Sequence, residues 1–153
     1  MEKKRQTRIL AKADKQLVAA LSSEIQETYR PVILKGPDKS LAMIRMREPV
    51  KQSLFYLGEV IVHEAVVEID GICGAAVLMH DNADNDAAKT LDMAIIDAAI
   101  NKGVFMHMNM LLELEEQQNE QLMRENALHL KTMVNFESMD QEAPRDLNAF
   151  KKA

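Results

Sequence analysis

The sequence predicts an α+β domain: an N-terminal helix pair, a four-stranded antiparallel sheet covered by a helix, and a long C-terminal helical arm. Residues alternate between apolar and polar from Leu57 to Ile69, with many β-branched side chains, as is typical of a half-buried strand. Asp70-Gly71 follows, a dipeptide that tight hairpins favour, and residues 75–79 return as a second strand. Apolar residues recur at helical spacing on both sides of this hairpin, which makes the class α+β.

The chain before the sheet predicts two helices. The first covers Glu2 to Ala13 and is basic, and Asp14 is a suitable N-cap for the second. The second helix carries an apolar stripe of Leu17, Val18, Leu21 and Ile25. It ends before Pro31, because proline disfavours the α conformation in the residue that precedes it. We interpret the basic start as a solvated helix face rather than a nucleic-acid site, since it is short and has no aromatic residues for stacking.

Two further strands are predicted between the helices and the hairpin, over residues 32–35 and 41–47. Residues 36–39, Gly-Pro-Asp-Lys, have the composition of a turn. Consecutive strands usually pair, so we expect a meander of four. Arg45 and Arg47 share one face of the second strand. This pair is either a solvated face, which is the commoner case, or a contact for a phosphate or a partner's carboxylate.

The C-terminal third predicts a helix from Ala87 to Lys102, ended by Gly103, and then an arm over about residues 104–139. The arm begins with an apolar face formed by Phe105, Met108, Leu111 and Leu112. A polar stretch, residues 113–121, is expected to lie outside the core, and the stripe after it to dock on another chain. That stripe consists of Met123, Ala127, Leu130 and Val134. We expect residues 1–139 to form one domain and residues 140–153 a flexible tail.

Composition limits the functional classes. The net charge of −5 divides into +6 for residues 1–52 and −11 for the remainder. Cys73 is the only cysteine, which excludes an internal disulfide, and we expect it to be a small packing residue. The first ten residues lack the apolar region of a secretory signal, and no apolar run has the length of a membrane helix. We therefore expect a cytoplasmic protein that binds neither membrane nor nucleic acid.

Catalytic and metal-binding motifs are absent from the sequence: it contains no HExxH, CxxC, P-loop, GxGxxG or GxSxG pattern. A metal site formed by His80, Asp81 and Asp84 is a weak alternative, because the loop lacks the glycine that an EF-hand requires. His63 is expected to be a hydrogen-bonded or partly exposed residue of the sheet. The residues by themselves thus predict no catalytic, cofactor-binding or metal-binding site.

The segment FYLGEVIVHEAVVEIDGICGAAVLMHD, followed by AIIDAAI, resembles the signature of the G subunit of the bacterial phosphonate carbon–phosphorus lyase system, the PhnG family. The matching positions are Leu57, Gly58, Glu59, Val60, Val62, Glu64, Ala65, Val67, Glu68, Ile69, Asp70, Gly71 and Gly74. A later pattern matches at Thr132, Val134, Phe136 and Met139, with Ser138 in place of threonine. The chain departs from the family at His63, where threonine or another small polar residue is expected, and in its acidic residues 113–121.

The resemblance implies an accessory subunit that acts with subunits I, H, J and L, and that has no catalytic residue or cofactor of its own. In this family the I subunit, helped by G, H and L, displaces adenine from ATP with a phosphonate, giving α-D-ribose 1-phosphonate 5-triphosphate. The J subunit later cleaves the carbon–phosphorus bond with an iron–sulfur cluster and S-adenosylmethionine. A second copy of this chain within the complex is the alternative partner that we expect for the arm.

The candidate interface residues are Leu57, Gly58, Glu59, Met123, Ala127, Leu130, Val134 and Phe136, with Arg45 and Arg47 as the candidate anion contact. Two alternatives stay open beside this interpretation. One is an autonomous hydrolase or transferase that uses Arg45, Arg47, Glu59 and Glu64. The other is an interaction module unrelated to phosphonates.

Overall fold

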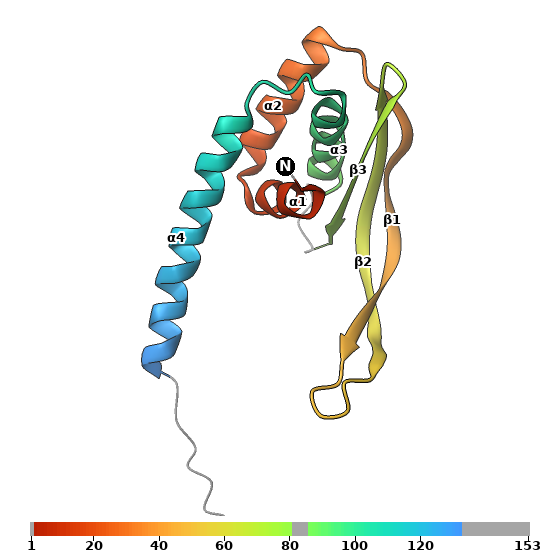
Figure 1. The fold of residues 1–153 in the computed structure, drawn as a ribbon. Coiled ribbons are helices and arrows are strands. Elements are labelled where there is room, and N and C mark those ends of the chain that lie inside the picture. Colours follow the sequence, from red (N-terminus) through yellow and green to blue (C-terminus); the bar gives the residue numbers. More distant parts are fainter. Residues whose placement is uncertain (1, 81–85, 133–153) are drawn as a thin grey trace, which may run out of the picture. The chain divides into compact units, whose positions relative to one another are not determined.

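A computed structural model describes residues 2–80 and 86–132. Its elements are α1 (Lys3–Lys12), α2 (Lys15–Thr28), β1 (Val32–Arg47), β2 (Leu54–Ile69), β3 (Ile72–Met79), α3 (Asp86–Lys102) and α4 (Met108–Thr132) (Figure 1). The chain divides into two compact units, residues 1–119 and 120–153, and α4 contributes to both. The α+β class is confirmed.

The N-terminal helix pair lies where the sequence places it. The Asp14 side chain accepts a hydrogen bond from the Gln16 main-chain N–H at 2.7 Å, which caps α2 as predicted. The predicted stripe of α2 faces the core, since Val18, Leu21 and Ile25 are buried. Ile9 and Leu10 of α1 join the same core.

The prediction of four strands is wrong, because the described residues form a three-stranded sheet in the order β1-β2-β3. Residues 36–39, predicted as a turn, continue the first strand, and the two predicted strands are halves of β1. The pairing of β1 with β2 shifts between Ile33 and Lys35 and again between Lys35 and Asp38. Irregularities of this kind absorb extra residues. Pro37 is tolerated there because β1 is an edge strand, where a missing N–H need not interrupt the ladder.

The β2–β3 turn confirms the prediction made for Asp70-Gly71. Asp70 has φ 49° and Gly71 has φ 83°, and positive φ at both central residues defines the type I′ turn that suits the strand twist. Ile69 pairs with Ile72 directly across the turn. Burial on β2 then alternates as expected, with His63, Ala65, Val67 and Ile69 all buried.

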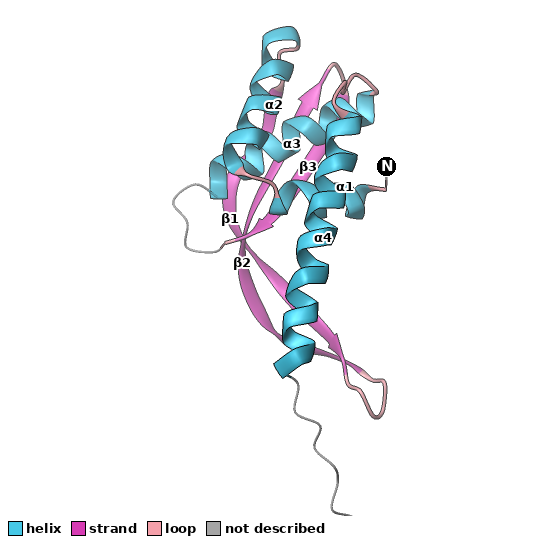
Figure 2. Ribbon diagram, turned by 90° about the vertical axis from the view of Figure 1, so that its left-hand side faces the viewer, coloured by secondary structure: helices cyan, strands magenta, loops and turns pink. Residues whose placement is uncertain are grey.

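Helix α3 packs on β3 and on the second half of β2. The closest approach is at Gly74 of β3, which lies against the backbone of Ala94 and Ala98. The first half of β2 and its partner in β1 run on past this helix (Figure 2). The helix therefore covers part of the sheet, not the whole sheet as predicted.

Cys73 is exposed at the start of β3, so its prediction as a packing residue is wrong. The physical reason is the alternation of the strand: Gly74 and Ala76 are buried, so their neighbour Cys73 points the other way.

Helix α4 starts at Met108, four residues later than predicted, because Gly103 ends α3 with φ 80° and a short connection follows. Leu111 is fully buried, Phe105 and Met108 pack against the core, and Leu112 is exposed. The helix continues unbroken through the polar stretch. Val134, Phe136 and the tail predicted for residues 140–153 lie outside the described residues. In the described part of the chain, no helix combines the length and apolar character needed to cross a membrane.

Candidate functional site

An apolar sheet face lies beyond the reach of α3. Residues directly opposite each other on antiparallel strands share a face, and Leu41 pairs with Ile61 while Met43 pairs with Glu59. Ile61 is two residues before His63, so this face continues the one that is buried further along β2. Here it is open: Leu41 is 63%, Met43 58% and Ile61 46% exposed. We call Leu41, Met43, Arg45, Tyr56 and Ile61 the open hairpin face.

Of the predicted interface residues of β2, Glu59 lies on this face opposite Met43, and Leu57 and Gly58 lie beside it. The pairing shifts after Ile44, which pairs with Gly58, to Arg45, which pairs with Tyr56, so Leu57 is left as an extra residue in the ladder. Leu57 is 59% exposed. Gly58 and Glu59 are exposed as well. Their role in an interface stays a prediction. All three residues are exposed, as contact with a partner requires.

Arg45 and Arg47 have different surroundings. Arg47 Nη1 donates to the main-chain oxygen of Gln52 at 2.9 Å and so helps to close the β1–β2 loop. Arg45 is exposed opposite Tyr56 on the open hairpin face. The anion contact predicted for the two arginines stays a prediction.

The four residues proposed for an autonomous enzyme do not all meet, since Arg45, Arg47 and Glu59 share one face of the sheet and Glu64 lies on the other. Glu59 and Glu64 lie five positions apart in a regularly paired part of β2, so their side chains are on opposite faces. Glu64 instead forms an ion pair with Lys35, with Nζ and Oε2 at 2.6 Å. The arrangement offers no shared position where these carboxylates and the two arginines could act on one substrate.

The basic start of α1 is not a simple solvated face. Arg5 Nε donates to both carboxylate oxygens of Glu115 on α4, at 2.8 and 2.9 Å, and Arg8 adds a contact at 3.2 Å. Glu115 is 8% exposed. Gln118 Nε2 also donates to the Ile9 main-chain oxygen at 3.0 Å. The expectation that residues 113–121 lie outside the core is therefore wrong at Glu115, where paired cations compensate the burial of the carboxylate.

This ion pair gives a pH prediction. The hydrogen bonds from Arg5 hold the pKa of Glu115 below its ordinary value of 4.5. The contribution to stability is therefore complete above about pH 4.5 and is lost as the pH falls through the lowered pKa. We expect Glu115→Gln to lower the thermal midpoint at pH 7 and to flatten its fall below pH 4.5. Melting curves from pH 3 to 7 measure both, and Glu116→Gln, at an exposed neighbour, is the matched control. An equal acid dependence in Glu115→Gln and in the unmodified chain would contradict the prediction.

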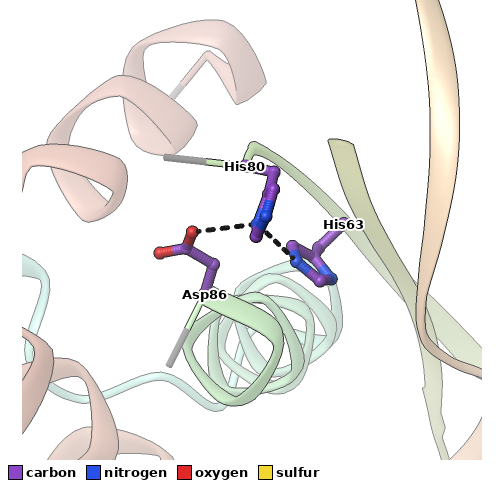
Figure 3. A group of neighbouring side chains, drawn as sticks. All are labelled: His63, His80 and Asp86. Atoms are coloured by element: carbon purple, nitrogen blue, oxygen red, sulfur yellow. Dashed lines mark hydrogen bonds and ion pairs between the residues drawn. The ribbon is translucent and has the colours of Figure 1, made fainter. Parts of the chain in front are cut away.

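A second group of polar side chains lies where β2, the end of β3 and the start of α3 meet (Figure 3). His63 Nε2 lies 3.1 Å from His80 Nδ1, and His80 Nδ1 lies 3.5 Å from Asp86 Oδ2. His63 is thus a hydrogen-bonded sheet residue, as predicted. Of the weak metal site suggested by the sequence, only His80 is in this group, since Asp81 and Asp84 lie outside the described residues.

Sequence reasoning did not connect His63 and Asp86 with His80. His63 lies in β2, His80 directly follows β3 and Asp86 begins α3, so no local spacing in the sequence predicts that they meet. The alternation of side chains in the hairpin could have predicted the contact between the two histidines. Leu78 pairs with His63, and His80, two residues after Leu78, lies on the same face of the sheet. Among the described residues, this group could hold a metal ion, with each side chain offering one ligand atom and all three atoms lying within 4.8 Å of one another.

The described residues form an α+β domain, and the exposed apolar side chains of the open hairpin face are of the kind that often marks an interaction site. A comparison with protein families gives the more specific assignment. The family model described as "Phosphonate metabolism protein PhnG" matches residues 1–141. The chain therefore belongs to the PhnG family, which is part of the carbon–phosphorus lyase system, and the resemblance seen in the sequence is confirmed. No curated protein matches the chain.

Proposed function

We propose that this chain is an accessory subunit of the carbon–phosphorus lyase core complex in the cytoplasm. It would hold the I subunit in the arrangement in which a phosphonate displaces adenine from ATP, giving α-D-ribose 1-phosphonate 5-triphosphate. The transferase activity belongs to the complex formed with I, H and L, and not to this chain alone. The iron–sulfur cluster and S-adenosylmethionine belong to the J subunit.

The observation that carries this proposal is the open hairpin face. Leu41, Met43 and Ile61 continue the buried face of the sheet past the end of its helical cover, and Tyr56, which is 60% exposed, extends it. Covering such side chains gains roughly 25 cal/mol for each Å² of apolar area removed from water. A partner chain laid against β1 and β2 would continue the core that α3 forms further along the sheet.

The end of α4 offers a second apolar surface, in the unit that starts at residue 120. Leu122, Met123, Leu128 and Leu130 are 43%, 71%, 62% and 68% exposed. Ala127 of the predicted stripe is exposed as well. Of these exposed residues, Met123, Ala127 and Leu130 lie four and three positions apart, so they adjoin on one face of the helix and suit docking in a partner's groove. We assign that partner as the I subunit, and a second copy of this chain is the alternative outcome of the test.

The proposal predicts that catalysis requires the complex. Purified chain incubated with ATP and methylphosphonate is expected to release no adenine above background, whereas a mixture of I, H and L should release more adenine once this chain is added. Liquid chromatography of adenine measures both. Adding heat-denatured chain to the mixture of I, H and L is the control, and it should not increase adenine release. Steady adenine release by this chain alone, or equal release with and without it, would contradict the accessory role.

A further inference from the structure

We propose that His63, His80 and Asp86 form a binding site for one divalent transition-metal ion, with zinc as the best-suited ion. The site would join β2, the end of β3 and the first residue of α3 (Figure 3). Imidazole nitrogens and a carboxylate oxygen are the donors that zinc accepts in sites with three protein ligands, where a solvent molecule takes the fourth position. The inference does not depend on the proposed function.

The spacing of the ligand atoms fits a tetrahedral ion. Zn–N and Zn–O bonds of about 2.0–2.2 Å at tetrahedral angles separate neighbouring ligand atoms by roughly 3.3–3.5 Å. His63 Nε2 and His80 Nδ1 are 3.1 Å apart, and His80 Nδ1 and Asp86 Oδ2 are 3.5 Å apart. All three atoms lie within 4.8 Å of one another, which is close enough for one ion to contact them after the side chains adjust.

The other nitrogen of His63 orients this ring for binding. His63 Nδ1 lies 3.4 Å from the main-chain oxygen of Pro37. A carbonyl oxygen can only accept, so this contact places the hydrogen on Nδ1 and leaves the lone pair of the neutral ring on Nε2, which faces His80. A ligating histidine commonly makes this type of outer contact with a main-chain oxygen, which fixes its tautomer and its orientation. The main-chain oxygen that makes this contact lies in the irregularly paired part of β1, between Lys35 and Asp38.

The three side chains are largely buried, so little water competes with them for a bound ion. His63 is 5% exposed, and the side chains of His80 and Asp86 are 18% and 13% exposed. The two imidazole rings meet edge to face, with ring centroids 5.0 Å apart. Only one hydrogen fits between the two facing nitrogens, which are 3.1 Å apart. A metal ion would accept the lone pairs of both facing nitrogens and of one Asp86 carboxylate oxygen at once.

The direct test is a titration of the tag-free full chain, freed of metal by chelator and dialysis. Cobalt(II) alone should bind with one equivalent and give the intense visible absorption of a tetrahedral ion, and zinc chloride should displace it. Zinc should also raise the thermal midpoint. A cobalt spectrum of the octahedral aqua type, or the absence of saturation at one equivalent, would overturn the site.

Variants then assign the ligands. His80→Ala and Asp86→Asn should each weaken zinc binding by on the order of 100-fold in a chelator competition, at the upper end of losses seen for changes around metal ligands. His107→Ala is the matched control, because His107 also contacts a carboxylate, Glu24 at 2.8 Å, but lies outside this group. Unchanged affinity in Asp86→Asn, which keeps the side-chain shape, or an equal loss in His107→Ala would overturn the assignment. Circular dichroism checks that each variant is folded. If His80→Ala unfolds, the zinc affinity of Asp86→Asn alone tests the site.

Discussion

Gly74→Ala is expected to lower the free energy of unfolding by about 3 kcal/mol, at the upper end of the usual cost of overpacking. An added Cβ would lie 2.6 Å from Ala98 Cα and closer still to the Ala98 nitrogen and the Ala94 oxygen. All three are backbone atoms of α3, so no side-chain rotation relieves the clash. The helix must move away from β3, which opens the core that Ala94 and Ala98 fill.

Chemical denaturation with urea measures this effect, and Gly58→Ala is its matched control. Gly58 lies in β2 with no atom within 4 Å of an added Cβ, and its φ is not positive. We expect Gly58→Ala to change the free energy of unfolding by less than about 0.5 kcal/mol. Equal stabilities for Gly74→Ala and Gly58→Ala would show that α3 does not pack on β3 as closely as described.

Met43→Asp and Leu130→Asp are expected each to abolish co-purification with the I subunit and growth on a phosphonate as the sole phosphorus source. Burying a methionine or leucine side chain against a partner stabilises the complex by about 1.5–3 kcal/mol, and a buried aspartate adds an uncompensated charge to that loss. Both side chains are exposed in the isolated chain, at 58% and 68%, so the thermal midpoint should hardly change.

Val50→Asp controls for the added charge. Val50 is 83% exposed in the β1–β2 loop and belongs to neither apolar surface, and Val50→Asp should retain partner binding and growth. Retained binding in Met43→Asp would refute the open hairpin face as the interface, and retained binding in Leu130→Asp would refute the arm. Unfolding of Leu130→Asp would place this side chain in the chain's own core, which would also refute the docking arm.

The sequence by itself determined the features that depend on local physics. The alternation of apolar and polar residues in β2 predicted a half-buried strand. Asp70-Gly71 predicted the turn, because glycine adopts positive φ without strain and aspartate does so more readily than most residues. Asp14 predicted the start of α2, because an N-cap is a local contact between a side chain and a main-chain N–H only two residues away. The motif around this hairpin also sufficed to indicate the PhnG family.

Only the tertiary structure decided the features that join distant residues. Residues 36–39 have turn chemistry, yet pairing with β2 holds them in one long edge strand. Glu115 lies in a polar stretch, yet Arg5, more than a hundred residues earlier, pairs with its carboxylate and compensates its burial. His63, His80 and Asp86 meet because β2, β3 and α3 pack together. Local propensity could not predict these outcomes, because a partner far along the chain contributes the free energy that decides each of them.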